Sequence, residues 1–219
     1  MKLAIFDFNG TIFPQETMPF ILKEWYRQGY PRFKLVKVFS SLLPLYLKYK
    51  MFSGGKDMEI KAVKGVSRIF TGMKKDDVQK FFQKAAESAS KSFNSRVIAE
   101  IKNNFRKKDR LLLLSGAFDL FLEEVASILD IDTVLASKLP FHNEKAQPSS
   151  REHIIRGKQK LEVLQDHFQN KDINWKKSTA YADSIHDLPL LEMVGEPVTV
   201  NPDDELAQIA QNKNWPVIR

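Results

Sequence analysis

The fold predicted for this chain is decided by one short stretch near its amino terminus, Leu3-Ala4-Ile5-Phe6-Asp7-Phe8-Asn9-Gly10-Thr11. Four apolar residues come first, and the polar groups of Asp7, Asn9 and Thr11 follow. A short apolar run that ends in turn residues is typical of a strand buried on both faces of a parallel sheet. In open parallel sheets, reactive groups gather just beyond the carboxyl ends of strands. We therefore expect these polar side chains at such an edge.

The polar residues of this stretch suit chemistry on a phosphate. Asp7 is placed to act as a carboxylate nucleophile that carries a covalent phosphoryl group. Gly10 allows a tight turn close to an anion, and the hydroxyl of Thr11 can donate a hydrogen bond to a phosphoryl oxygen. The alternative is an ordinary buried strand followed by an Asn-Gly turn, which is a common dipeptide at such places. The stretch alone leaves both interpretations open.

The composition is that of a globular protein without cysteine chemistry. The 219 residues are 43% hydrophobic and 28% charged, and none is cysteine. This excludes disulfides, thiolate zinc sites and a cysteine nucleophile, and it favours a cytoplasmic location. Asp7 interrupts the amino terminus too early for a signal peptide, and no uncharged apolar run approaches the roughly 20 residues that span a bilayer.

The net charge of +7 is concentrated in one segment. Between Pro14 and Ser95 there are 16 lysines and arginines and 7 acidic residues, a net charge of +9, whereas the rest of the chain carries −2. A basic face attracts phosphate esters, nucleic acid or an anionic membrane. For most of these lysines, a solvated helical surface is the simpler interpretation.

The basic segment has the apolar spacing of helices. Four are expected, and together they predict a small bundle. The second, which Pro44 should bend or end, lies in an aromatic and basic stretch, Pro31–Phe52, that would also suit an interfacial membrane helix. We prefer bundle core for this stretch. The four helices cover Glu16–Gln28, Phe33–Tyr49, Asp57–Phe70 and a run that starts at Met73.

Beyond Ser95, helices alternate with short apolar strands. This pattern predicts an α/β fold with a Rossmann-like parallel sheet that helices cover on both faces. The stretch Pro140–Ser150 is polar and contains prolines, so a loop is expected there. The predicted strands cover Arg110–Gly116, Thr133–Ala136, Ser178–Asp183 and Pro197–Val200.

Four groups of polar residues occur in a fixed order along the predicted core. They are Asp7-Phe8-Asn9-Gly10-Thr11, Ser115-Gly116, Gly157-Lys158-Gln159-Lys160 and Asp183-Ser184-Ile185-His186-Asp187. In order and spacing they resemble the motifs of the haloacid dehalogenase superfamily, and most closely its phosphoserine-phosphatase-like branch, which has a helical cap inserted after the first motif. The resemblance covers the first dozen residues and the chain after Ser95; the cap matches only in place and helical character.

The resemblance implies a role for each group. Asp7 would be the nucleophile, and Asp7, Asp183 and the main-chain carbonyl of Asn9 would hold Mg²⁺, with Asp187 supporting the metal shell or Lys160. Hard oxygen ligands suit this ion. Lys160 would neutralise charge between nucleophile and phosphate. The predicted phosphate-binding residues are Gly10, Thr11, Ser115, Gly116, Lys160 and His186. The alternatives are a helix cap at Ser115, a surface lysine at 160 and helix-start carboxylates at 183 and 187.

Asn9 departs from the family pattern, which has an aspartate there as general acid and base. An amide cannot transfer the proton, and losing that group commonly removes ~10²–10⁴-fold of rate. The chain would then be a variant that traps a complex, a slow or specialised enzyme, or a protein that binds phosphorylated ligands without turnover. His186 could replace the acid, although a loop histidine in solvent is the simpler interpretation.

Together these observations predict a core of residues 1–13 and 95–219 with a helical cap of residues 14–94. The expected function is Mg²⁺-dependent hydrolysis of a small phosphate monoester through an aspartyl phosphate on Asp7, with reduced turnover because of Asn9. The alternatives are a catalytically weak protein that binds phosphorylated ligands and a membrane or nucleic-acid binder that uses the basic cap. No nucleic-acid-binding motif is found, and no nucleic-acid partner or membrane span is expected.

Overall fold

The computed structural model of the protein describes residues 1–40, 58–148 and 154–219. These form a six-stranded sheet, in which every pair of neighbours is parallel, as the sequence predicts. The strand order is β3-β2-β1-β6-β7-β8, so the first strand of the chain lies between β2 and β6 near the centre. The strands are β1 (Leu3–Phe6), β2 (Arg110–Phe118), β3 (Thr133–Ser137), β6 (Thr179–Ala182), β7 (Glu196–Val200) and β8 (Val217–Ile218).

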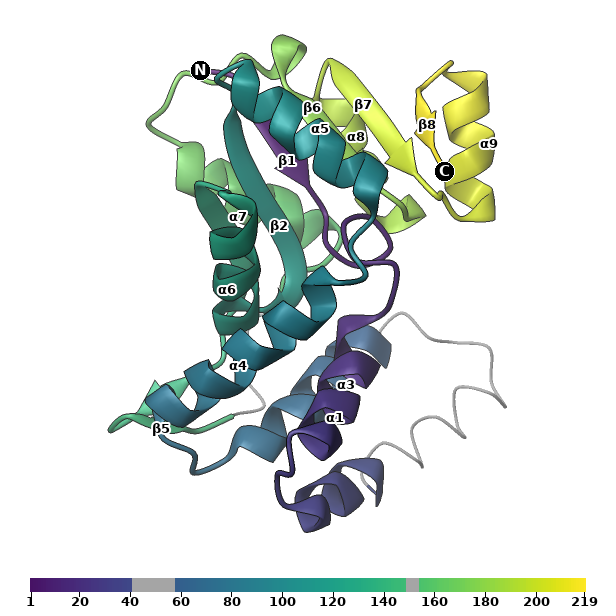
Figure 1. Cartoon of the computed structure of the whole chain (residues 1–219). Coiled ribbons are helices and arrows are strands. Elements are labelled where there is room, and N and C mark those ends of the chain that lie inside the picture. Colours follow the sequence, from purple (N-terminus) through teal and green to yellow (C-terminus); the bar gives the residue numbers. More distant parts are fainter. Residues whose placement is uncertain (41–57, 149–153) are drawn as a thin grey trace.

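Helices cover both faces of this sheet, which confirms the predicted α/β fold class (Figure 1). Along β1, alternate side chains enter two different apolar cores. Ala4 and Phe6 pack with residues of α5 (Ser95–Arg106) and α6 (Asp119–Leu129). Leu3 and Ile5 face the opposite layer, formed by α7 (Lys158–Phe168), α8 (Leu188–Met193) and α9 (Asp204–Asn212).

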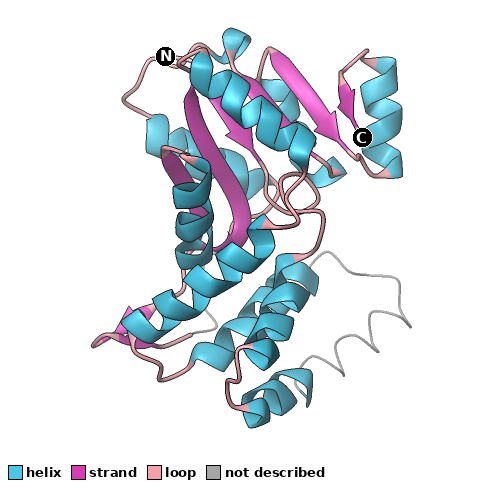
Figure 2. Ribbon diagram, in the orientation of Figure 1, coloured by secondary structure: helices cyan, strands magenta, loops and turns pink. Residues whose placement is uncertain are grey.

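A helical insertion, described over residues 14–40 and 58–94, separates β1 from α5 and extends beyond one end of the sheet (Figure 2). The two segments that connect the insertion to the rest of the chain lie side by side, since the Asn94 N–H donates to the Ile12 carbonyl over 2.8 Å. The helices lie where the sequence predicts them, except that the predicted helix Phe33–Tyr49, with Pro44, is described only to residue 40. The described elements are α1 (Thr17–Arg27), a helix over residues 32–40, α3 (Met58–Ser67), a 3₁₀ turn η1 (Arg68–Phe70) and α4 (Lys75–Ser90).

The insertion shares one apolar core with the adjacent face of the sheet. Phe82 on α4 lies 6.0 Å from Phe118 and 5.9 Å from Phe121, measured between ring centroids. On α1, the ring of Phe20 lies 6.2 Å from that of Phe121. Aromatic contacts of this kind add to the apolar area buried. Side-chain packing, and not the two connecting segments alone, therefore holds the insertion against the core.

The expected loop over Pro140–Ser150 contains a hairpin, so this prediction is wrong for residues 141–146. Strands β4 (Phe141–His142) and β5 (Lys145–Ala146) pair around Asn143 and Glu144, which both have positive φ. Hairpin turns favour such conformations, but glycine is their usual sequence signal and is absent here. The hairpin also binds the insertion, because the Gly72 N–H donates to Ala146 and the Lys75 N–H donates to Glu144.

The predicted strand end at Ser115-Gly116 is also wrong, because β2 continues to Phe118. Its pairing with β3 shifts register between Ser115 and Phe118, so the strand is irregular where the polar residues occur. Helix α6 begins at Asp119, and its N-cap residue is Phe118. Ser115 is therefore a strand residue and not the helix cap that was its alternative interpretation.

The bundle-core prediction for the basic aromatic stretch is right for one face of the described helix only. Leu35 and Val38 are buried, whereas Phe33, Val36 and Phe39 are exposed. Within the three described ranges, no helix has both the length and the apolar character needed to cross a membrane.

Candidate active site

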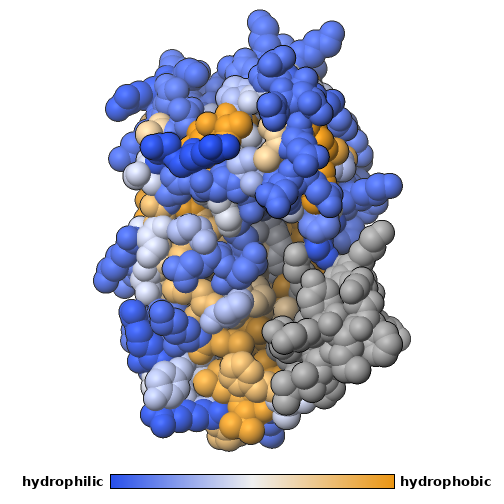
Figure 3. All heavy atoms as spheres, turned by 90° about the vertical axis from the view of Figure 1, so that its right-hand side faces the viewer, coloured by the Kyte–Doolittle hydropathy of each residue, from blue (hydrophilic) through white to orange (hydrophobic). Residues whose placement is uncertain are grey.

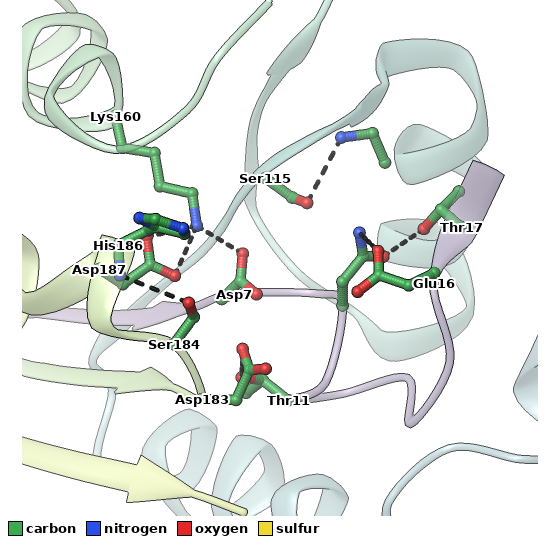
Figure 4. Close-up of polar contacts among 12 residues, drawn as sticks. Asp7, Thr11, Glu16, Thr17, Ser115, Lys160, Asp183, Ser184, His186 and Asp187 are labelled. Atoms are coloured by element: carbon green, nitrogen blue, oxygen red, sulfur yellow. Dashed lines mark hydrogen bonds and ion pairs between the residues drawn. The ribbon is translucent and has the colours of Figure 1, made fainter. Parts of the chain in front are cut away.

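The polar groups singled out by the sequence converge at the carboxyl ends of three adjacent strands (Figure 4). Asp7 directly follows β1, and its N–H donates to the Tyr181 carbonyl on β6 over 2.9 Å. Asp183 directly follows β6, and Ser115 lies on β2. Two further groups come from helical elements: Lys160 from the first turn of α7 and Asp187 from the 3₁₀ turn η3 (Ile185–Asp187).

Lys160 is a buried cation held between two buried carboxylates. Its Nζ donates to Asp7 Oδ1 over 2.7 Å and to Asp187 Oδ2 over 2.8 Å. The same Nζ lies 2.7 Å from Asp187 Oδ1, an atom that accepts no hydrogen bond. Buried charges persist only when they are paired in this way, because an isolated one would be strongly disfavoured. The surface-lysine interpretation is therefore wrong for Lys160.

Burial and mutual repulsion raise the pKa values of two of the carboxylates, Asp7 and Asp183. Desolvation by burial, helped by the charge of Asp187, raises the pKa of Asp7 to about 7 despite the attraction of Lys160. Burial and the charges of Asp7 and Asp187 raise the pKa of Asp183 to about 8. Burial acts to lower the pKa of Lys160, but the charges of Asp187 and Asp7 outweigh it, so this pKa is raised. One lysine does not balance three carboxylates.

These carboxylates fit a divalent cation. One oxygen from each of Asp7, Asp183 and Asp187 lies within 4.8 Å of the others. With Lys160 protonated and all three ionised, the cluster has a net charge of −2, which such a cation would balance. Oxygen ligands of this type suit Mg²⁺. The raised pKa values of Asp7 and Asp183 fit a site in which these carboxylates become ionised when a cation binds.

Gly10 and Thr11 contact Asp183 and do not line the cavity described below. A Cβ on Gly10 would lie 1.9 Å from Asp183 Oδ2, and Gly10 has a φ of +69°, so only glycine suits this close approach. The buried hydroxyl of Thr11 donates to Asp183 Oδ1 over 3.4 Å. In this structure the two residues position a carboxylate, whereas the motif predicts that they bind the phosphate directly.

A cavity of about 280 Å³ opens between the strand ends and the helical insertion. Ser115, Gly116 and His186, all predicted to bind phosphate, line it. Its polar floor also contains Asp7, Lys160, Asp183 and Asp187. The facing wall comes from the insertion and is mostly apolar, with Glu16, Met18, Pro19, Ala62 and Val63. A ligand here would contact both parts of the molecule.

Asn9 connects the end of β1 to the start of the insertion. Its Nδ2 donates to Glu16 Oε2 over 3.3 Å, and its Oδ1 accepts a hydrogen bond from the hydroxyl of Thr17. Glu16, Thr17 and Arg156 lie outside the motifs that predict the site, yet Glu16 and Arg156 line the cavity. Position in the sequence could have indicated them, since Glu16 and Thr17 begin the first helix after Asn9 and Arg156 directly precedes Gly157.

His186 is exposed, as expected of a loop histidine, although it lines the same cavity. Its main-chain N–H donates to the Ser184 hydroxyl over 3.4 Å. Ser115 accepts a hydrogen bond from the Ala117 N–H over 3.4 Å, so its own hydroxyl proton can be donated to a ligand.

Comparisons with known proteins agree with this geometry. The family model for haloacid dehalogenase-like hydrolases matches residues 4–192. An inhibition of morphological differentiation protein from Streptomyces azureus is 23% identical over 98% of this chain and 77% of its own length. A histidinol-phosphatase from Neisseria meningitidis is 32% identical, but the match covers 50% of this chain and 51% of that protein.

Solved structures share the fold. A Bordetella pertussis protein of unknown function has a TM-score of 0.81 at 16% identity, and the match covers 100% of this chain and 98% of the other. Phosphoserine phosphatase in its apo form has a TM-score of 0.61 at 17% identity, over 99% and 92% of the two chains.

Proposed function

The chain belongs to the haloacid dehalogenase-like hydrolase family, and from that premise we propose that it is a Mg²⁺-dependent phosphatase that hydrolyses a small phosphate monoester through Asp7. One observation carries the proposal: Lys160 bridges Asp7 and Asp187 on the floor of a cavity, with Asp183 beside them. The phosphatase named among its relatives supports the same reaction class.

Asp7, Asp183 and Asp187 offer the carboxylate oxygens for the metal, and the family pattern adds the main-chain carbonyl of Asn9. When bound, Mg²⁺ would reduce the repulsion between the anionic nucleophile and the anionic phosphate. Gly10 and Thr11 hold Asp183 in place for this task.

Asp7 supplies the nucleophile in the first step. Lys160 holds Oδ1, and the other carboxylate oxygen attacks phosphorus. A bond between that oxygen and phosphorus forms as the bond from phosphorus to the ester oxygen breaks, and the departing oxygen takes a proton and leaves as an alcohol. Lys160 and the hydroxyl of Ser115 stabilise the phosphoryl oxygens. In the second step, water attacks the same phosphorus, which releases phosphate and restores Asp7.

The site lacks the usual carboxylate for proton transfer at position 9. Asn9 cannot donate a proton to the leaving oxygen or accept one from the attacking water. Esters with good leaving groups would therefore react more easily than alkyl phosphates. His186 lines the cavity and can supply the proton at modest efficiency, which gives an enzyme with reduced turnover.

The first test is a screen of phosphate esters with Mg²⁺, followed by Asp7→Asn on the best substrate. We expect turnover to fall below detection, because an amide at position 7 cannot form the acyl phosphate. Mass spectrometry of a quenched reaction should place the phosphoryl group on the peptide that contains Asp7.

Asp109→Asn is the matched control. Asp109 is also a buried carboxylate paired with a lysine, Lys2, but it does not line the cavity. This variant should keep its turnover. A phosphoryl group on Ser115, or full activity in the presence of a chelator, would overturn the proposed mechanism. Tight binding of esters with no phosphoryl transfer would instead favour a protein that only binds phosphorylated ligands.

A further inference from the structure

The helix over residues 32–40 has an apolar outer face. Phe33, Val36 and Phe39 are 59%, 66% and 57% exposed, whereas Leu35 and Val38 on the inner face are buried. Single exposed apolar residues are normal on protein surfaces, but three at helical spacing form a continuous patch that needs an explanation. Figure 3 shows apolar surface on this lower part of the molecule.

Cations flank the apolar residues. The guanidinium of Arg32 lies 4.7 Å from the ring centroid of Tyr26, which is itself 55% exposed. The ammonium of Lys37 lies 5.7 Å from the ring centroid of Phe33. No acidic residue occurs between Pro31 and Ser40. The face is therefore both aromatic and positively charged.

A cavity of about 400 Å³ adjoins this face, and none of the described residues that line it is acidic. It is lined by Phe33, Lys34, Lys37, Val38, Arg68 and Thr71. Lys34 is held in place, since its Nζ donates to the carbonyls of Ile69 and Thr71 over 2.8 and 3.1 Å. The cavity thus offers three cations beside exposed apolar side chains, and it does not share its lining with the candidate active site.

The positive charge of this face indicates which binding partner is complementary to it. A second copy of the same face would bring like charges together, which disfavours self-association. The surface of a membrane rich in anionic lipid offers both complements at once: phosphate groups for the cations and an acyl boundary for the apolar side chains. A soluble anion could bind in the cavity, but it would leave Val36 and Phe39 exposed to water.

We propose that this face docks on the surface of an anionic membrane. Phe33, Val36 and Phe39 enter the headgroup boundary, while Arg32 and Lys37 contact lipid phosphates. Lys34 and Arg68 complete a cationic cavity for one headgroup. The association is peripheral, and it would bring the candidate active site close to a membrane.

Sedimentation of the full chain with phosphatidylglycerol vesicles tests the proposal, with phosphatidylcholine vesicles in parallel. We expect binding to the first and little to the second. Added salt should weaken the binding, because surface charges are screened within about 10 Å at moderate ionic strength. Phe33→Ser with Phe39→Ser should weaken it at least about tenfold, and Lys37→Gln about fivefold.

Matched controls lie on α5 and α6, outside the insertion. Phe105 on α5 is 59% exposed, the same as Phe33, and Ile128 on α6 is 44% exposed. Phe105→Ser with Ile128→Ser, and Lys102→Gln, should leave vesicle binding unchanged. Melting curves would confirm that every variant is folded, as expected for exposed positions.

Several outcomes would overturn the proposal. They are equal binding to both kinds of vesicle, equal loss in the test and control variants, and no binding to either vesicle at low salt. Concentration-dependent dimers that Phe33→Ser with Phe39→Ser abolishes would assign the face to a second copy. Binding of inorganic phosphate or an oligonucleotide without vesicle binding would assign the cations to a soluble anion. None of these results would affect the proposed reaction at Asp7.

Discussion

At the scale of single residues, Asn9 occupies the position where the resemblance to the phosphoserine-phosphatase-like branch predicts an aspartate. The amide cannot exchange protons, but it has a structural role, because it binds Glu16 and Thr17 at the start of the insertion. An aspartate at this position could still accept the Thr17 hydroxyl. Its other oxygen would face the carboxylate of Glu16, and like charges at this distance raise a pKa.

Asn9→Asp should therefore create a general acid with a pKa above the ordinary value for aspartate. We expect alkyl phosphates to gain ~10²–10⁴-fold in single-turnover rate, because alkoxides leave poorly without a proton. Aryl phosphates such as p-nitrophenyl phosphate should gain less in the first step. Hydrolysis of the aspartyl phosphate should gain for every substrate, since the carboxylate can also activate water.

A second substitution, Glu16→Gln, provides the control for this argument. In the Asn9→Asp background, its amide would donate to the new carboxylate and lower the pKa, so the gain at neutral pH should shrink. Unchanged rates on alkyl and aryl esters would show that the missing acid is not limiting. Because asparagine before glycine is prone to deamidation, peptide mass mapping should first confirm that Asn9 is intact.

At the scale of elements, the site exists because β2, β1 and β6 are parallel neighbours. Their carboxyl ends meet at one edge, which brings Ser115, Asp7 and Asp183 together although they are far apart in sequence. Helix α7 adds Lys160 from its first turn. This convergence buries three carboxylates beside one another, and burial, helped by their mutual repulsion, raises the pKa values of Asp7 and Asp183.

These pKa values predict a dependence on pH and metal. Without metal, Asp7 and Asp183 have pKa values of about 7 and about 8, above the ordinary value of 3.8. Between that ordinary value and these raised values, the folded state therefore binds more protons than the unfolded state. Their contribution to stability is therefore complete below about pH 4 and is lost as the pH rises through 7 to 8. Mg²⁺ must displace these protons, so it should bind more tightly as the pH rises.

Melting curves at pH 6 and pH 8, with and without Mg²⁺, measure this effect. We expect at least about tenfold weaker binding at pH 6, which corresponds to ~1.4 kcal/mol and a melting shift smaller by about 3–5 °C. In Asp183→Asn, the metal effect and its pH dependence should both be largely lost. A Mg²⁺ shift of equal size at both pH values would contradict the assigned protonation states.

At the scale of the whole molecule, the candidate active site lies between two parts of the chain. The floor of the cavity belongs to the sheet, and the facing wall belongs to the insertion. We infer that the insertion, residues 14–94, acts as a cap that closes on a bound ester, with hinges near Phe13–Pro14 and Ser92–Ser95. The shared aromatic core and the β4–β5 hairpin limit the size of that movement.

Hydrogen exchange with and without Mg²⁺ and orthovanadate tests this movement. Exchange should slow at both hinges and around Met18 and Val63, which face the cavity. The amides of Gly72 and Lys75, which already bind the hairpin, should change little and serve as an internal reference. Identical exchange with and without the phosphate mimic would indicate a fixed insertion.

The sequence by itself determined the parallel sheet and the identity of the central polar residues. Buried strands are short apolar runs, and the residues that follow them are adjacent in sequence, so Asp7 and Asp183 could be assigned from local pattern. The family spacing then selected Lys160, which the structure places against Asp7. The prediction of the parallel sheet succeeded because each strand depended on one segment of the chain and on the known geometry of parallel strands.

Only the tertiary structure decided which partner each group meets. The Thr11 hydroxyl is directed at Asp183, Asn9 binds Glu16 and Thr17, and the predicted loop after Pro140 is a hairpin on the insertion. Likewise, helical spacing shows that residues 32–40 have apolar side chains but not which of them face solvent. The physical reason is the same in each case: such contacts join segments far apart in the chain, and their geometry depends on packing that no local pattern encodes.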